Sequence, residues 1–244
     1  NSSGSLLWMQ RYSTPFNEVP NSIAVDLNGN IAVTGIRTSS GGNNDFLTVY
    51  YNSSGTQQWA EFYNDASNGT DEAWGSVFDQ SGNLYITGNS PGNSTSSDFT
   101  LIKYNNAGMV QWINKYNGSA VNSYDYSRSI TIDNSSNVYI TGPSQGPGLV
   151  YDYAALKYNS EGMLKWVQRY NGPANYQDFA SMIVLDNLNN VYVTGYSWGG
   201  SSEKYNAATI KYYQCTLLAN AGNDTTIYSG YGSGTAVLKA NASG

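Results

Sequence analysis

The chain has 244 residues, enough for one large domain or two smaller ones. Charged residues make up only 11% of it, and the formal net charge is −6 with no cluster of Lys or Arg, which argues against a nucleic-acid partner. No apolar run approaches the roughly 20 residues that span a bilayer, so we expect no membrane insertion. Cys215 is the only cysteine, which excludes an internal disulfide framework.

Short β-like segments follow one another from the start of the chain. The first four are LLWMQRY at 6–12, SIAVD at 22–26, NIAVTG at 30–35 and DFLTVYY at 45–51. The same four kinds of segment then recur three times, as QQWAEFY (57–63), GSVFD (75–79), NLYITG (83–88), DFTLIKY (98–104), VQWINKY (110–116), SITID (129–133), NVYITG (137–142), DYAALKY (152–158), LKWVQRY (164–170), MIVLD (182–186), NVYVTG (190–195) and NAATIKY (206–212).

Two independent markers share one period. The tryptophans of the first kind of segment are 51, 53 and 54 residues apart, at Trp8, Trp59, Trp112 and Trp166. The Thr-Gly pairs are 53, 54 and 53 residues apart, starting at Thr34, Thr87, Thr141 and Thr194. The connections carry Gly, Asn, Asp and Ser, as hairpin turns require, and no segment has a sustained helical period. The sequence therefore predicts an all-β protein of four repeats.

Four-stranded antiparallel units of about 50 residues are typical of β-propeller blades. In the segment 164–170, Trp166 and Tyr170 share one face and Val167 lies on the other, so both faces carry packing residues, as a blade between two neighbours requires. Two arrangements stay open. Segment 206–212 could pair with 6–12 and close a four-bladed ring, or the four blades could form an arc of a larger ring, with edge strands exposed.

The consensus KYNSxGxxxWxxxYNG, followed by SIxxDxxGNVYVTGxS, resembles the SBBP repeat of bacterial secreted and surface β-propeller proteins. The resemblance covers about residues 1–212. It implies a propeller fold and an extracellular setting, and the family name implies seven blades, which favours the arc. Two departures are Ala32, where the other repeats have tyrosine, and NAATIKY at 206–212.

The last segment, 213–244, leaves the repeat pattern. Its sequence LANAGNDTTIYSGYGSGTAVLKANASG resembles the opening strands of a PKD-like or other immunoglobulin-like domain, with too few strands for a complete sandwich. Since Asn1 falls within a repeat and Gly244 within this segment, we expect a mature or partial chain of a larger multidomain protein, whose other domains are partners of the propeller.

Most acidic residues fall in three repeat columns. The columns are Glu18, Asp71, Asp125 and Asp178; Asp26, Asp79, Asp133 and Asp186; and Asp45, Asp98 and Asp152. A residue that recurs in every blade most simply accepts backbone N–H bonds in the following turn. The second column offers a weaker alternative, calcium, because DLNGN at 26–30 and DQSGN at 79–83 resemble the start of an oxygen-rich loop. Otherwise we expect no cofactor.

Aromatic residues outside the repeat frame are the candidate ligand contacts. Loops at blade ends present binding groups on a rigid scaffold, and exposed Trp and Tyr can stack on sugar rings or anchor a protein. The alternative is that these side chains only cap the blade ends. The candidates are Trp198, Trp74, Tyr196, Tyr176, Tyr151 and Tyr126.

Catalytic groups are sparse. The chain has no histidine, which excludes a Ser-His or Cys-His nucleophile and a three-histidine zinc site. Acids outside the frame, such as Glu61 and Glu203, suggest no pair for glycoside hydrolysis. The arginines Arg11, Arg37, Arg128 and Arg169 could form a sialidase-like cluster, but Arg11 and Arg169 share one repeat column.

We therefore expect a secreted or cell-surface, non-catalytic module that binds a protein or a glycan at its loop face. Sparse charge and abundant Asn, Ser, Thr, Gly and Tyr also favour an extracellular location. The alternatives are a glycan-active hydrolase or lyase whose catalytic residues lie partly outside this chain, and a passive structural spacer.

Overall fold

The computed structural model describes residues 4–92, 96–120, 122–200 and 204–214. These residues form fifteen β-strands and no α-helix, so the predicted all-β class is confirmed. The strands are β1 (Glu18–Val25), β2 (Ile31–Thr38), β3 (Asn44–Tyr51), β4 (Gln57–Tyr63), β5 (Glu72–Phe78), β6 (Leu84–Ser90), β7 (Asp98–Tyr104), β8 (Val110–Tyr116), β9 (Ser129–Ile132), β10 (Val138–Gln145), β11 (Tyr151–Tyr158), β12 (Leu164–Tyr170), β13 (Asp178–Leu185), β14 (Val191–Trp198) and β15 (Tyr205–Tyr212).

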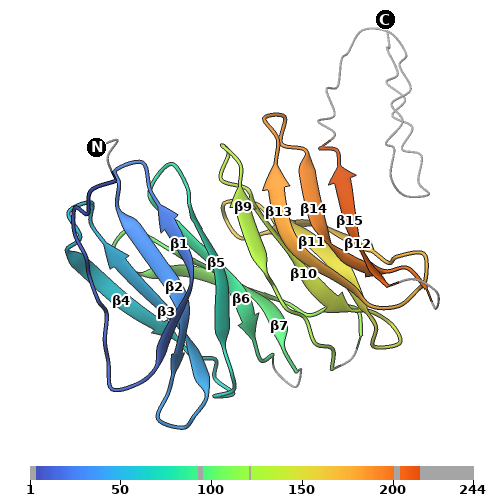
Figure 1. The fold of residues 1–244 in the computed structure, drawn as a ribbon, viewed down its shortest axis with the longest axis horizontal. Helices are drawn as coiled ribbons and strands as arrows, with labels where there is room; N and C mark the ends of the chain where they lie inside the picture. Colours follow the sequence, from blue (N-terminus) through green and yellow to red (C-terminus); the bar gives the residue numbers. More distant parts are fainter. Residues whose placement is uncertain (1–3, 93–95, 121, 201–203, 215–244) are drawn as a thin grey trace, which may run out of the picture.

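The strands form four separate antiparallel sheets, each made of strands consecutive in the chain. The orders are β1-β2-β3-β4, β5-β6-β7-β8, β9-β10-β11-β12 and β13-β14-β15. The sheets stand side by side in chain order, so that the first and the last lie at opposite ends of the molecule (Figure 1). This is a propeller-like row of blades, and we refer to the sheets as blades 1 to 4.

The blades are out of phase with the sequence repeat by one strand. Each blade begins with the segment that ends in Asp, and blades 1 to 3 finish with the Trp segment of the following repeat, such as β4 for blade 1. Residues 6–12, expected as a strand, form none, and in the described part of the chain β15 pairs with β14 alone. The four-bladed closure between 206–212 and 6–12 is therefore not present in this structure.

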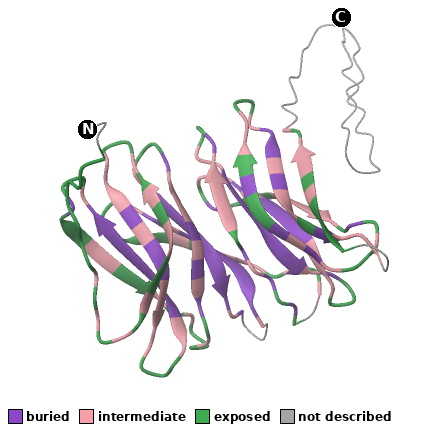
Figure 2. Cartoon of the chain, viewed as in Figure 1, coloured by how far each residue is buried: buried purple, intermediate pink, exposed green. Residues whose placement is uncertain are grey.

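The core consists of the layers between neighbouring blades. Phe46 and Tyr50 of blade 1 pack against Ile86 and Ile102 of blade 2. Equivalent layers join blade 2 to blade 3 and blade 3 to blade 4. Buried residues accordingly concentrate on the strands in the middle of the row, while exposed ones are common at its ends (Figure 2). Both faces of a middle blade are buried, as the apolar residues on both strand faces predict.

The Thr-Gly phrase marks a contact between two strands of one blade. Gly142 lies against the backbone of Tyr126 and Ser127, which precede β9, and a Cβ on Gly142 would overlap the carbonyl oxygen of Tyr126. Thr141 donates its hydroxyl to the carbonyl oxygen of Ala154, 2.7 Å away. We call the first strand of each blade (β1, β5, β9 and β13) its inner strand. Blades 1, 2 and 4 have a bulge in the inner strand opposite the phrase, between Pro20 and Ser22 in blade 1. Glycine is needed there because the bulged backbone approaches so closely.

Residues 215–244 lie outside the described residues, and so does almost all of the segment expected to begin an immunoglobulin-like domain. In the described ranges, no helix has the length and apolar character needed to cross a membrane.

Candidate functional site

A cavity of about 440 Å³ opens across the inner strands of three successive blades. These inner strands contact one another in the order β5, β9, β13, so side chains from separate repeats converge there. The residues that line it are Trp74, Tyr126, Arg128, Pro143, Tyr151, Phe179, Ala180, Ser181 and Tyr196, which we call the aromatic cleft.

Each blade contributes a different part of the aromatic cleft. Trp74 comes from β5, and Tyr126 and Arg128 lie in the segment before β9. The Arg128 guanidinium carbon lies 4.4 Å from the centre of the Trp74 ring and 5.8 Å from that of Tyr126. Phe179 and Tyr196 are cross-strand neighbours on β13 and β14, with ring centres 5.0 Å apart in a stacked arrangement. Rigid strands therefore hold a cation and several rings around one cavity.

The rings continue beyond the cleft as an uninterrupted row. Tyr151 lies 5.1 Å from Phe179, and Tyr196 lies 5.1 Å from Tyr205, measured between ring centres. Tyr205 is in turn 5.1 Å from Trp198. Tyr176 ends the row, 5.9 Å from Trp198 and with half of its surface exposed. We call this series of rings the aromatic row. Its members, in spatial order, are Tyr126, Tyr151, Phe179, Tyr196, Tyr205, Trp198 and Tyr176.

Two properties of the cleft bear on what it can hold. Burial raises the pKa of the Tyr126 hydroxyl and of the Tyr151 hydroxyl, and the Tyr126 hydroxyl adds to the second shift, so both stay neutral hydrogen-bonding groups at neutral pH. The indole N–H of Trp74 is buried and meets no acceptor in the described part of the chain. A buried donor without an acceptor calls for an explanation, and a bound molecule or water is one.

The structure brings the six sequence candidates together. Four of them line the cleft, namely Trp74, Tyr126, Tyr151 and Tyr196. Trp198 and Tyr176 belong to the aromatic row that extends from it.

Sequence reasoning missed two members of the row, Phe179 and Tyr205. Phe179 is the second residue of β13 and Tyr205 is the first residue of β15, and neither residue type nor position indicated that these strand ends lie beside the cleft. Of the four arginines, the cleft contains Arg128 alone, and Arg169 instead forms an ion pair with Asp152 at 3.0 Å. The described arginines therefore do not form the sialidase-like cluster considered above.

The calcium candidates lie in four separate turns, one in each blade. In each turn one oxygen of the Asp carboxylate accepts the backbone N–H groups of the residues two and four positions later. The other oxygen accepts a side-chain N–H from the Asn four positions later, as Asp133 does from Asn137 at 2.8 Å. The same bonds occur at Asp26, Asp79 and Asp186. Within the described ranges no three His, Cys, Asp or Glu gather as a metal site. These carboxylates serve the turns that carry them.

Comparisons with known proteins find distant structural similarity. No curated protein matches the sequence. A protein of unknown function from Dyadobacter fermentans superposes with a TM-score of 0.50 and 11% identity over 82% of this chain, which spans 62% of the length of that protein. A gluconolactonase from Xanthomonas campestris superposes with a TM-score of 0.40 and 13% identity, over 74% of this chain and 56% of its own.

One family model matches the sequence directly. The model of the SBBP family, described as a beta-propeller repeat, matches residues 115–148 and 165–201. The first match runs from β8 through β10, and the second from β12 through β14, so each covers the last strand of one blade and the first two strands of the next. Residues 115–148 and 165–201 are therefore similar in sequence to the SBBP beta-propeller repeat.

Proposed function

We propose that this protein is a non-catalytic, extracellular binding module whose aromatic cleft and aromatic row hold a glycan chain. The observation that carries the proposal is the row of rings that leads from the cleft to Tyr176 over blades 3 and 4. A sugar ring has apolar C–H faces and a polar rim, which suits flat rings with hydroxyl groups at their edges.

Exposure supports contact with a ligand. Tyr196 has 43% and Tyr205 has 45% of its surface exposed, although each packs edge to face against the other. Ring pairs held in this way present fixed surfaces, so a ligand that stacks on them costs little side-chain entropy. The cleft volume of about 440 Å³ lies within the range of small-molecule and sugar-sized sites.

The charges around the cleft favour binding over hydrolysis. No Asp or Glu is among the nine described residues that line it, whereas glycoside hydrolysis by the common mechanism needs two carboxylates about 5–10 Å apart. Arg128 is the only charged residue of the lining. A guanidinium beside a sugar site pairs well with a carboxylate, so we expect glycans that contain uronic acids to bind more tightly than neutral ones.

The test is a glycan array probed with the whole chain, followed by calorimetry with the best glycan. Tyr196→Ala and Trp198→Ala should each weaken binding by about tenfold, equivalent to about 1.4 kcal/mol. Tyr213→Ala is the matched control, because Tyr213 is an exposed tyrosine outside the cleft and the row, and it should bind as the wild type does.

Other outcomes would redirect the proposal. Arrays that retain no glycan, or variants that bind as well as the wild type, would contradict it and leave a protein partner or a spacer role. New reducing ends or unsaturated products in the incubated glycan would show a hydrolase or lyase and would refute the non-catalytic assignment.

A further inference from the structure

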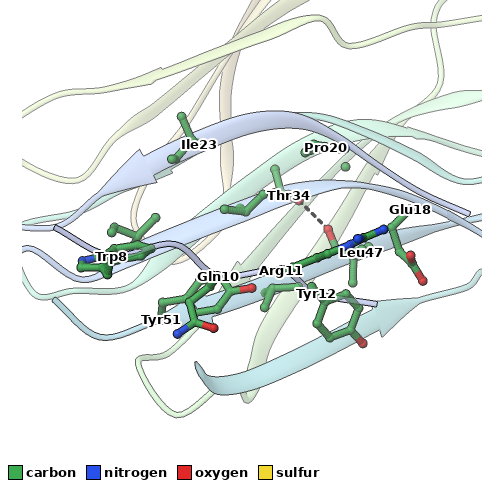
Figure 3. Close-up of a pocket in the computed structure, with 14 residues that line it drawn as sticks. Trp8, Gln10, Arg11, Tyr12, Glu18, Pro20, Ile23, Thr34, Leu47 and Tyr51 are labelled. Atoms are coloured by element: carbon green, nitrogen blue, oxygen red, sulfur yellow. Dashed lines mark hydrogen bonds between the residues drawn. The ribbon is translucent and has the colours of Figure 1, made fainter. Parts of the chain in front are cut away.

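The outer face of blade 1 carries an apolar cavity of about 340 Å³. Its floor is the face of β2 and β3 turned away from blade 2, with Val33, Leu47 and Tyr51. Residues 8–12 lie along one side of it, and Trp8 and Tyr12 approach Tyr51 and Leu47 in Figure 3. The cavity also contacts Ile23 of the inner strand, whose side chain is 68% exposed.

The same face is filled in every other blade. On blade 2, the positions of Val33 and Val49 are held by Ile86 and Ile102, and the neighbouring blade covers both completely. Ile183 of blade 4 stands at the position of Ile23, three residues before the repeated Asp, and is only 3% exposed because blade 3 packs on it. The cavity on blade 1 is therefore the place of one more blade.

Trp8 identifies the kind of blade that fits. Trp59, at the outer edge of blade 1, lies over Gly108 in a turn of blade 2, with 2.9 Å from the position of a glycine Cβ to the ring, and Trp112 lies over Gly162 at the same distance. Trp8 lies over Gly55 in the same way, at 2.7 Å. Residues 6–12 thus hold the position of the outer strand of a blade whose other three strands would cover blade 1.

Blade 4 presents the matching three strands. It consists of β13, β14 and β15, and no strand among the described residues lies on the far edge of β15. The face of blade 4 that points away from blade 3 is open to solvent, and Met182 on this face is 61% exposed. Tyr192 on this face stands at the position of Tyr139, which blade 4 covers completely.

We propose that two copies of this chain associate head to tail, with blade 4 of one copy packed on blade 1 of the next and residues 6–12 completing blade 4 as its fourth strand. No rearrangement is needed, because residues 6–12 already occupy the outer-strand position over blade 1. A second copy is the occupant that the structure favours, because its blade 4 offers the three strands and the open edge that residues 6–12 require.

The repeat fixes the pairing register of the proposed contact. In blade 3, Lys157 faces Trp166 and Ala155 faces Gln168 across adjacent strands. Transferred to the contact, Lys211 of one copy faces Trp8 of the other, and Thr209 faces Gln10. Trp166 lies 6.0 Å from Tyr139 of its own blade, so Trp8 should pack on Tyr192 of the second copy.

The register gives a sharp test by disulfide trapping of the whole chain, with Cys215→Ser to remove the native thiol. Facing residues on antiparallel strands bring their Cβ atoms within disulfide reach. Gln10→Cys combined with Thr209→Cys should give a covalent bond between chains on mild oxidation. Gln10→Cys combined with Ala208→Cys is the matched control, because a shift of one residue turns the side chains to opposite faces. A bridge within one chain would overturn the proposal in favour of four-bladed closure.

The second arm of the test is sedimentation of the chain over concentrations up to about 100 μM, where an association with a micromolar Kd is nearly complete. We expect dimers or larger species of the 26.5-kDa chain. Ile23→Asp should shift the species to monomers, whereas Leu27→Asp, an exposed turn position that is polar in the other repeats, should not. A wild-type chain that stays monomeric throughout, or equal behaviour of the two variants, would refute the contact.

Discussion

The Tyr139 hydroxyl donates a hydrogen bond to Oδ2 of Asp133 over 3.0 Å, and both side chains are buried. This bond ties the turn after the inner strand to the layer between two blades. Tyr85 with Asp79 and Tyr192 with Asp186 repeat it in blades 2 and 4. The Asp column therefore supports both a local turn and the packing of the blade.

Replacement of Asp133 by alanine should destabilise the fold. Four donors, the N–H groups of Ser135 and Asn137, the Asn137 amide and the Tyr139 hydroxyl, would lose their acceptor. We expect the free energy of unfolding in urea to fall by about 2–3 kcal/mol, because four hydrogen bonds are lost and the buried Tyr139 hydroxyl would be left unpaired. Asn134→Ala, in the exposed part of the same turn, is the control and should change it by less than about 0.5 kcal/mol. Calcium should not raise the stability of the wild type, and a clear rise would restore the metal interpretation.

A methyl group on Gly142 should be costly. The Cβ of Gly142→Ala would overlap the Tyr126 carbonyl oxygen, and backbone atoms cannot move aside as a flexible side chain can. We expect a loss of about 3 kcal/mol or more in thermal or urea unfolding. Gly41→Ala is the matched control, since the nearest atom to its Cβ is the Ser39 hydroxyl at 3.9 Å. Equal stabilities of the two variants would show that the backbone at Tyr126 adapts to a side chain.

Acid should weaken the fold partly through Asp65. Burial raises the pKa of this carboxyl, but the bonds from Lys115 and Ser67 outweigh burial and hold it at about 2, below the ordinary 3.8. A depressed pKa contributes stability that is present above about pH 4 and is lost as the pH falls toward 2. We expect a loss of about 1 kcal/mol from this group between pH 4 and 2 after solvent screening. Asp65→Asn should flatten the pH dependence of urea unfolding by that amount, and an unchanged slope would exclude this role.

Alkali should weaken the fold through the buried tyrosines. Burial raises the pKa of Tyr85, Tyr139 and Tyr158 above the ordinary 10.0, and the Asp79 and Asp133 carboxylates raise the first two further. A raised pKa means that these tyrosines hold their protons more tightly in the folded state than in the unfolded state. Their contribution to stability is therefore fully present below about pH 10 and is lost as the pH rises above it. Tyrosinate absorbance during an alkaline titration should therefore rise together with unfolding. Full ionisation of these rings in a chain that stays folded would contradict the packing described here.

The repeat explains why so much of the architecture could be predicted from the sequence. A period shared by Trp and Thr-Gly fixes four similar units, and bulk on both strand faces requires a neighbour on each side. The sheet boundaries could not be placed in the same way, because a repeat can be divided between any two of its strands. Only the hydrogen bonds show that the Trp strand closes the preceding blade, as β4 does with β3.

Ala32 shows how a departure from the repeat is absorbed. Blades 2 to 4 have tyrosine at this position, with lysine opposite on the next strand, as in Tyr139 and Lys157. In blade 1 the pair is Ala32 and Tyr50, so the ring comes from the other strand of the same pair. The Tyr50 pKa is raised by burial and by the Asp26 carboxylate, which shows that this ring approaches the same turn. Sequence alone identified the missing tyrosine and did not identify its replacement.

The aromatic cleft was predictable in part. Residues such as Trp74 and Trp198 stand out because the other repeats lack them. The convergence of the residues that line the cleft depends on the angle between blades, which brings β5, β9 and β13 into contact, and no single repeat encodes that angle. Arg128 gave no signal of its position, because a lone arginine before a strand is an ordinary surface residue.

The one-strand offset between repeat and blade has a consequence for how such a molecule can change in length. Since the second, third and fourth repeats each supply the last strand of one blade and the first three of the next, inserting or deleting a whole repeat joins one strand to three strands that already fit it. Duplication or deletion of a repeat in the gene could therefore lengthen or shorten the row of blades without requiring new contacts between strands. In protein design, the number of repeats could be varied in the same way to set the length of the row of blades.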